Sequence, residues 1–228
     1  MKRVHIAPTL LDAHREMDRL FVEDGRTPLS EVVFPRPAFG DDQEKVDEEQ
    51  LRNTEFAQPA IGVLSSGLFK ILAEAGFKPD LVAGHSFGEL TALWAARALS
   101  DEDFFALARA RGKAMAAPED PGFDAGSMLA VIGDVEAIRK EVDKDPAVSV
   151  ANLNSKQEVV LAGPTEGVAA LQERLKGKGY RVVALPVSAA FHTPLVGHAQ
   201  KPFAEAIRAA KFRSPQCPVY SNTTGRPY

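Results

Sequence analysis

The chain has 228 residues, of which 45% are hydrophobic and 25% are charged, and its formal net charge is −4. This is an ordinary globular composition, and the acidic balance disfavours a nucleic-acid surface, which needs concentrated positive charge. The single Cys217 excludes an internal disulfide framework and a cysteine metal cluster, and fits a reducing compartment.

No apolar run approaches the roughly 18 to 20 residues that span a bilayer. The start of the chain has the basic pair Lys2-Arg3, but charged residues follow soon after it and no signal-peptide apolar core is visible. We therefore expect a cytoplasmic protein without a membrane partner.

The first third of the chain predicts two helices separated by a surface excursion. Apolar residues at helical spacing predict helices over 9–22 and 57–76. In the second helix, Pro59 suits the first turn and Gly76 is a natural stop. The segment 23–53 holds several prolines and an acidic run, so we interpret it as a solvated loop and helix face.

A strand and two helices follow in the middle of the chain. An apolar strand is predicted over 81–84 and an alanine-rich helix over 89–99. Ser100 is a good N-cap for the next helix, over about 101–116.

After Gly126 the pattern changes to short strands alternating with helices. Strands are predicted over 128–132, 148–152, 158–163 and 181–185, and helices over 135–143 and 165–178. The order βαββαβ is that of a ferredoxin-like fold. A helix over 194–210 and a strand at 219–221 then return to the main body.

A possible nucleophile lies in the segment Gly84-His85-Ser86-Phe87-Gly88, which is a G-x-S-x-G motif between the predicted strand and helix. On such a turn the Ser86 hydroxyl is exposed at the positive end of the helix, and both glycines relieve crowding. The Phe87 N–H can then point at a developing oxyanion. The alternative is a glycine-rich turn whose serine only caps the helix.

A serine nucleophile needs a base, and the chain has five histidines. His192 lies where the predicted inserted segment returns to the main body, a junction that can face a cleft, so we predict it as the base, with His198 as the fallback. His85 adjoins the serine and is expected to pack or hydrogen-bond beneath the turn. His14 is on a helix with mostly exposed neighbours, and His5 is near the terminus.

Arg111 is predicted to lie on the apolar side of the helix over 101–116. The residues that share its face by helical spacing are Phe104, Ala108 and Met115. A guanidinium that points inward is costly unless it meets an anion. Either a carboxylate of the protein or a carboxylate of a substrate satisfies this, and the spacing leaves both open.

These motifs are similar to those of the malonyl-CoA:acyl carrier protein transacylases and of the acyltransferase domains of polyketide and polyunsaturated fatty acid synthases. The resemblance covers nearly the whole chain, with matching segments at 54–60, 84–89, 109–115, 152–155, 190–192 and 218–225.

The resemblance implies a malonyl transferase that works through an acyl-serine intermediate, with Ser86 as nucleophile and His192 as base. The substrate-binding residues that it implies are Arg111 for the malonyl carboxylate, together with Phe87, Gln58, His85, Asn152 and Phe191. The bulk of Phe191 resembles that of malonyl-selective domains, in which it crowds a 2-methyl group.

The same resemblance predicts the fold and the partners. We expect an α/β protein with a hydrolase-like core of parallel sheet and helices over 1–125 and 188–228. A smaller ferredoxin-like subdomain is expected to be inserted over 126–187. Coenzyme A thioester is expected as a substrate, with no permanent cofactor and no metal. The expected partners are the phosphopantetheine arm of an acyl carrier protein and other domains of a synthase.

Two family features have no counterpart here, namely an opening strand with Gly-Gln-Gly-x-Gln and a segment beyond Tyr228. We therefore expect a trimmed fragment or a piece of a larger polypeptide.

A serine esterase or thioesterase is one alternative function, because it shares the Ser86 turn. Such an enzyme also needs an acidic residue between serine and histidine and a glycine-rich oxyanion loop, and neither stands out. A catalytically silent synthase domain is the other alternative.

Overall fold

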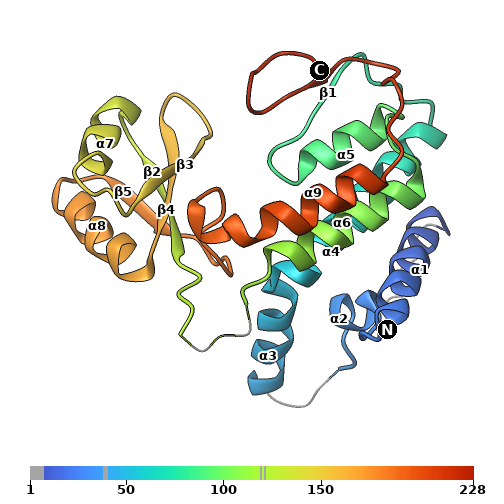
Figure 1. Ribbon diagram of the computed structural model, residues 1–228, viewed down its shortest axis with the longest axis horizontal. Coiled ribbons are helices and arrows are strands. Elements are labelled where there is room, and N and C mark those ends of the chain that lie inside the picture. Colours follow the sequence, from blue (N-terminus) through green and yellow to red (C-terminus); the bar gives the residue numbers. More distant parts are fainter. Residues whose placement is uncertain (1–7, 38–40, 119, 121) are drawn as a thin grey trace. The chain divides into compact units, whose positions relative to one another are not determined.

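The computed structural model describes residues 8–37, 41–118, 120 and 122–228, and the chain divides into two compact units (Figure 1). The first unit comprises the described residues up to Leu51, Glu55–Ala114 and Lys201–Tyr228; the second comprises Arg52–Thr54 and the described residues of Met115–Gln200. The second unit is therefore wider than the segment 126–187 proposed from the sequence.

The first unit combines helices with a pair of parallel strands. Its elements are α1 (Pro8–Glu23), α2 (Leu29–Val33), α3 (Asp41–Arg52), α4 (Thr54–Glu74), β1 (Val82–Ala83), α5 (Gly88–Ala95), α6 (Asp101–Met115), α9 (Gln200–Ala209) and β6 (Val219–Tyr220). Val82 lies opposite Val219 in parallel pairing. Because parallel strands end at the same edge of a sheet, the segments that follow β1 and β6 lie side by side. The α/β fold with parallel strands and helices that we predicted is confirmed.

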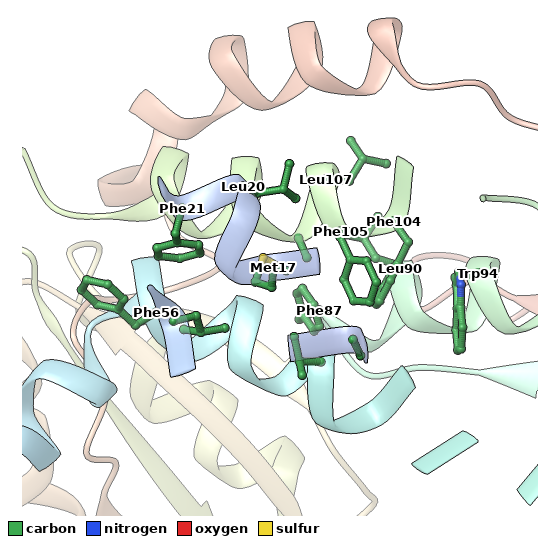
Figure 2. Packing of buried hydrophobic residues seen from close by; sticks show 14 of the residues in the cluster. Met17, Leu20, Phe21, Phe56, Phe87, Leu90, Trp94, Phe104, Phe105 and Leu107 are labelled. Atoms are coloured by element: carbon green, nitrogen blue, oxygen red, sulfur yellow. The ribbon is translucent and has the colours of Figure 1, made fainter. Parts of the chain in front are cut away.

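Aromatic side chains from several helices form the core of the first unit (Figure 2). Trp94 of α5 stacks on Phe104 of α6 with ring centroids 5.3 Å apart, and Phe21 of α1 stacks on Phe56 of α4 at 5.7 Å. Phe203 of α9 packs against the same cluster. This core joins α5 and α6, the two helices that carry the Ser86 turn and Arg111.

Helix α4 extends further at its N-terminus than predicted. It begins at Thr54, so Pro59 lies inside the helix and the prediction that Pro59 occupies the first turn is wrong. The end is as predicted, because Gly76 has φ +90° and the Phe77 N–H bonds to the Leu72 carbonyl at 3.0 Å.

By length and composition alone, α4 is apolar enough to cross a membrane, which the sequence pattern had not suggested. Phe56 and Val63 of α4 are buried in the folded core, so the composition is also that of a core helix. A single helix of this kind is weak evidence for a span.

Helix α5 is shorter than the predicted 89–99. It ends at Ala95 because Arg97 adopts the left-handed conformation, with φ +65°. The N–H of Ala98 then closes on the Leu93 carbonyl at 2.9 Å. Ser100 begins the next helix as predicted, and its hydroxyl accepts a hydrogen bond from the Asp103 N–H at 3.0 Å.

The prediction of a surface excursion over 23–53 is only partly correct. Helix α2 buries Leu29 and Val32 in the core, and Ser30 bonds through its N–H and hydroxyl to the Asp18 carboxylate at 2.8 and 2.6 Å. The prolines on either side of α2 predict a loop, so the burial of these two apolar residues is not evident from the sequence. Helix α3 is a mostly exposed acidic helix, as interpreted.

The second unit contains a four-stranded antiparallel sheet in the order β3-β4-β2-β5. Its elements are β2 (Ser127–Ile132), α7 (Val135–Val142), β3 (Ser149–Leu153), β4 (Glu158–Gly163), α8 (Thr165–Gly177), β5 (Arg181–Ala184) and the 3-10 helix η1 (Pro194–Ala199). Leu129 and Leu161 face the cluster formed with α7 and α8, whereas Met128 and Ala162 pack on the other face. This alternation is the period of two that strands require.

The helix predicted over 194–210 is two helices in the structure. A 3-10 helix, η1, occupies its first turns, and α9 follows from Gln200. Within η1, Val196 has non-helical dihedral angles, so the chain is kinked there, before α9 begins.

Candidate active site

The turn between β1 and α5 holds Ser86 in a strained backbone conformation. Ser86 has φ +52°, in the left-handed region that few non-glycine residues occupy. The Gly88 N–H bonds to the His85 carbonyl at 2.8 Å, and the Glu89 N–H bonds to the Ser86 carbonyl at 3.1 Å. These bonds close the turn, which is the strand-turn-helix geometry of a nucleophile elbow.

Of the two flanking glycines, the turn requires only Gly84. A Cβ atom on Gly84 would lie 1.9 Å from the Gly88 carbonyl oxygen, whereas a Cβ on Gly88 meets nothing within 4 Å. The prediction that both glycines relieve crowding is therefore wrong for Gly88. Crowding arises on one side because Gly84 itself approaches the backbone of the helix start.

Phe87 anchors the elbow in the core. Its side chain is 7% exposed and lies within the aromatic cluster (Figure 2), over the small residue Gly62 of α4. The ring is buried in the core, so the group of Phe87 that can donate a hydrogen bond to a ligand is its backbone N–H. No hydrogen bond from this N–H to another described residue is observed.

Arg111 lies beside the Ser86 hydroxyl. Its Nη2 donates to Ser86 Oγ at 3.4 Å, its Nη1 donates to Gln58 Oε1, and its guanidinium lies 6.0 Å from the Phe87 ring centroid. Phe104 and Ala108 on the same helix face are fully buried, so Arg111 occupies the apolar side of α6 as predicted.

The guanidinium of Arg111 has no carboxylate within ion-pair distance among the residues that the structure describes. Burial lowers the pKa of Arg111, and the charge of Glu89 opposes this shift. Arg109, on the same helix, is instead paired with Asp24 at 3.1 Å. Arg111 is thus a desolvated cation held by an amide and a hydroxyl, which is an environment suited to an incoming anion.

His85 is exposed, so of the two predicted roles beneath the elbow, packing or hydrogen bonding, packing is wrong and hydrogen bonding stays a prediction. Its backbone carbonyl takes part in the turn, because it accepts a hydrogen bond from the Gly88 N–H at 2.8 Å.

His192 and Phe191 belong to the second unit. His192 is exposed and has φ +63°, so it joins Ser86 and Arg97 among the non-glycine residues in the left-handed region. Thr193 fixes the turn, because its hydroxyl donates to the Ala190 carbonyl at 2.7 Å and accepts from the Leu195 N–H at 3.2 Å. A strained backbone of this kind persists only where its surroundings determine it, and it is frequent at functional sites.

Phe191 and Asn152 are both half-buried. Phe191 packs against the cluster that includes Met128 and Val160. Asn152 lies on β3 next to an irregularity in the pairing with β4, opposite Val160. Bulges of this kind redirect a side chain and are common beside functional sites.

The other histidines have identifiable environments. A ring nitrogen of His198 lies 3.0 Å from the Ala116 carbonyl, and its ring packs edge-on against Phe123. His14 is 7% exposed, contrary to the expectation of exposed neighbours, because α2 brings Phe34 against it at 5.3 Å. Burial lowers the pKa of His14, and Asp18 opposes the shift. His5 lies outside the described residues.

Two residues at the elbow were not identified from the sequence. The Glu89 carboxylate accepts a hydrogen bond from the Asn222 backbone N–H at 2.7 Å, and the Asn222 side chain donates to the Gly84 carbonyl. Both residues fall in the matching segments 84–89 and 218–225, and their local signals were an acid in the first turn of a helix and an asparagine after a strand. Neither signal indicates the contact between them.

Within the described part of the chain, no group of three or more His, Cys, Asp or Glu side chains is arranged to hold a metal ion. The groups gathered around Ser86 are a hydroxyl, an amide, a guanidinium and a backbone N–H. This arrangement suits acyl chemistry on an anionic substrate.

Comparison with known proteins gives a family match over nearly the whole chain. The family described as acyl transferase domain matches residues 7–228. The malonyl CoA-acyl carrier protein transacylase of Bacillus subtilis is 36% identical over 215 residues, covering 90% of this chain and 64% of that protein. One subunit of the polyunsaturated fatty acid synthase of Thraustochytrium sp. is 34% identical over 203 residues, covering 88% of this chain and 7% of that protein.

A solved structure of a type II polyketide acyl carrier protein in complex with its malonyl-transacylase matches with a TM-score of 0.82 and 29% identity. The match covers 97% of this chain and 69% of that one. The chain therefore spans only part of the length of the proteins that it resembles.

Proposed function

Because the chain belongs to the acyl transferase domain family, we propose that it transfers a malonyl group from coenzyme A to the phosphopantetheine thiol of an acyl carrier protein. The observation that carries this proposal is the contact of Arg111 with the Ser86 hydroxyl, in the absence of a carboxylate partner for Arg111 among the described residues. A malonyl ester on Ser86 places its free carboxylate one methylene away from the acyl carbon, within reach of this guanidinium.

The first half-reaction makes an acyl-enzyme. His192 removes the proton from Ser86, whose oxygen attacks the thioester carbonyl to form a tetrahedral oxyanion. The oxyanion collapses and expels the coenzyme A thiolate, which takes the proton from His192. The left-handed backbone of Ser86 and of His192 supports these roles.

The second half-reaction reverses the first with another thiol. His192 takes the proton of the phosphopantetheine thiol, and the sulfur attacks the malonyl-Ser86 ester. Collapse of the second tetrahedral oxyanion releases Ser86, which recovers the proton from His192. The kinetics are therefore ping-pong, and coenzyme A thioester is a substrate in a reaction that needs no permanent cofactor.

The Phe87 N–H is proposed as a donor to the oxyanion. This N–H makes no hydrogen bond to another described residue, and it lies at the start of α5, where the helix dipole favours negative charge. The phenyl ring in the core holds the peptide group in place, and a rigidly held donor stabilises developing charge best.

Arg111 is proposed as the clamp for the malonyl carboxylate, with Gln58 as its support. Gln58 is buried and accepts a hydrogen bond from Arg111 Nη1, and this bond holds the guanidinium group in one orientation. Phe191 is proposed to disfavour a 2-methyl group, and Asn152 and His85 are proposed to contact the substrate. The methyl discrimination is worth about 1 to 3 kcal/mol in an apolar pocket.

We also propose the finer fold that the sequence indicated. The segments 1–125 and 188–228 are taken as a hydrolase-like core, and the parallel strands and the elbow of the first unit support this. The segment 126–187 is taken as an inserted ferredoxin-like subdomain, supported by the antiparallel order β3-β4-β2-β5. The expected setting is a cytoplasmic synthase, with an acyl carrier protein and other synthase domains as partners, and without nucleic acid or membrane.

The test is to mix the chain with malonyl-CoA and follow the malonyl group by mass spectrometry. A stable protein adduct that moves to added holo-acyl carrier protein is expected. Turnover to free malonate would instead indicate a hydrolase, and no adduct a silent domain. Arg109→Ala provides a matched control for Arg111→Ala, because Arg109 lies on the same helix but is paired with Asp24.

A further inference from the structure

The turn that follows β6 is tightly organised by its own hydrogen bonds. The Ser221 hydroxyl accepts from the Thr223 N–H at 3.1 Å, and the Gly225 N–H bonds to the Ser221 carbonyl at 2.9 Å. Ser221 is buried, and its N–H bonds to the Arg226 carbonyl at 3.0 Å. The turn therefore presents Asn222 from a fixed backbone.

This turn lies next to the elbow because β1 and β6 run in parallel. Ala83 pairs with Tyr220, so the residues that follow each strand emerge at the same edge of the sheet. Asn222 follows β6 by two residues, and Ser86 follows β1 by three.

Three hydrogen bonds join the turn to the elbow. The Asn222 side-chain amide donates to the Gly84 carbonyl, on the strand side of Ser86. The Asn222 backbone N–H and the Tyr228 hydroxyl donate to Glu89 Oε1 at 2.7 and 3.1 Å, on the helix side. The two ends of the strained turn are thus tied to one neighbouring element.

The reason that such bonds matter is the backbone conformation of Ser86. Its left-handed φ is unfavourable for a residue with a Cβ, and it persists only where surrounding contacts determine it. The backbones of Gly84 and Gly88 approach so closely that a Cβ atom on Gly84 would lie 1.9 Å from the Gly88 carbonyl oxygen. A bond that holds the Gly84 carbonyl therefore also restricts the position of the Ser86 hydroxyl.

Glu89 also acts on the neighbouring cation. Its negative charge raises the pKa of Arg111, against the larger effect of burial. The carboxylate is not within ion-pair distance of Arg111, and it accepts hydrogen bonds from Asn222 and Tyr228 instead. The Arg111 guanidinium can therefore bind a carboxylate of a ligand, while the negative charge of Glu89 partly offsets its positive charge.

We propose that Asn222 and Glu89 are positioning residues that set the geometry of the Ser86 elbow from the turn after β6. This inference rests on Ser86 being the nucleophile of the proposed reaction. Neither residue touches the substrate in this mechanism, and both act on the rate of Ser86 acylation. Asn222 should leave the binding of malonyl-CoA unchanged, whereas Glu89 also carries a charge close to Arg111.

The experiment compares Asn222→Asp, Glu89→Ala, Glu89→Gln and Thr224→Ala with the wild-type chain. Asn222→Asp keeps the shape but removes the donor to Gly84. Glu89→Gln keeps an acceptor oxygen that Glu89→Ala removes. Thr224 is the matched control, because the partner of its hydroxyl among the described residues is the Arg226 N–H in the same turn.

The readouts are the rate of Ser86 acylation at saturating malonyl-CoA, the half-saturating concentration, and amide hydrogen exchange of residues 84–90. Asn222→Asp and Glu89→Ala are expected to slow acylation about 10- to 100-fold, as small misplacements of reacting groups do. For Asn222→Asp the half-saturating concentration of malonyl-CoA should not change, and for both variants the amide exchange at 84–90 should increase. Glu89→Gln should recover the exchange protection, and Thr224→Ala should match the wild type.

The proposal is overturned if Asn222→Asp and Thr224→Ala show the same acylation rate and the same exchange, or if all variants lose activity only in proportion to lost stability. If the wild type takes up no malonyl group, the proposed reaction fails. The exchange comparison at 84–90 alone then upholds or overturns the positioning role.

Discussion

Replacing Arg111 by alanine tests whether this residue binds the substrate carboxylate or only stabilises the fold. The guanidinium lies 3.4 Å from Ser86 Oγ and has no carboxylate partner among the described residues. At a separation of roughly 4 Å and an effective dielectric constant of about 20, a cation and a carboxylate attract by about 4 kcal/mol. Hydrogen bonds to charged groups contribute about 1.5 to 3 kcal/mol net.

We therefore expect Arg111→Ala to lose about 2 to 4 kcal/mol of transition-state binding for malonyl-CoA, or roughly 30- to 900-fold in kcat/KM. Acetyl-CoA, which has no free carboxylate, should not lose activity. The assay is coenzyme A release from both thioesters, with Arg109→Ala as the control.

Stability provides a second, independent readout for the same variant. Because Arg111 is desolvated without an ion pair, its removal should leave the free energy of unfolding unchanged or raise it slightly. The reasoning is refuted if Arg111→Ala unfolds the protein markedly, or if it slows malonyl and acetyl transfer equally. Either result would make Arg111 a structural residue.

Gly84→Ala should destabilise the fold by about 1 to 3 kcal/mol or more, because its Cβ would lie 1.9 Å from a carbonyl oxygen, whereas Gly88→Ala should change stability by less than about 0.5 kcal/mol in urea unfolding. Burial lowers the pKa of His14 below its ordinary 6.5, with Asp18 opposing, so the unfolded chain binds more protons there and the free energy of unfolding should fall as the pH drops below about 6.5. In His14→Gln that pH dependence should disappear; an unchanged slope would contradict the assignment. Phe191→Ala should raise transfer of methylmalonyl relative to malonyl about tenfold in a competition assay, and an unchanged ratio would exclude Phe191 as the selective residue.

Local sequence signals predicted the elbow and the position of Arg111 well. The G-x-S-x-G motif needs only its strand and helix to define the turn, and both lie within a few residues of Ser86. Arg111 was placed correctly on the apolar face because Phe104 and Ala108 repeat with helical spacing on α6. Signals of this kind depend on neighbours in the chain and can therefore be recognised without the fold.

The features that the sequence did not reveal depend on distant contacts. Asn222 and Glu89 are 133 residues apart, and nothing in either local pattern indicates their hydrogen bond. His14 was misjudged because its burial requires α2 to dock on α1, and the prolines around α2 suggested a loop. The early end of α5 was missed because Arg97, rather than glycine, adopts the left-handed turn.

The proposed mechanism depends most on Ser86 carrying the acyl group. The direct measurement is peptide mapping by mass spectrometry after brief exposure of the chain to malonyl-CoA, with Ser86→Ala in parallel. We predict one malonyl group on the peptide that contains Ser86 and none in the variant. A malonyl group on any other residue, or equal labelling of Ser86→Ala, would contradict the mechanism.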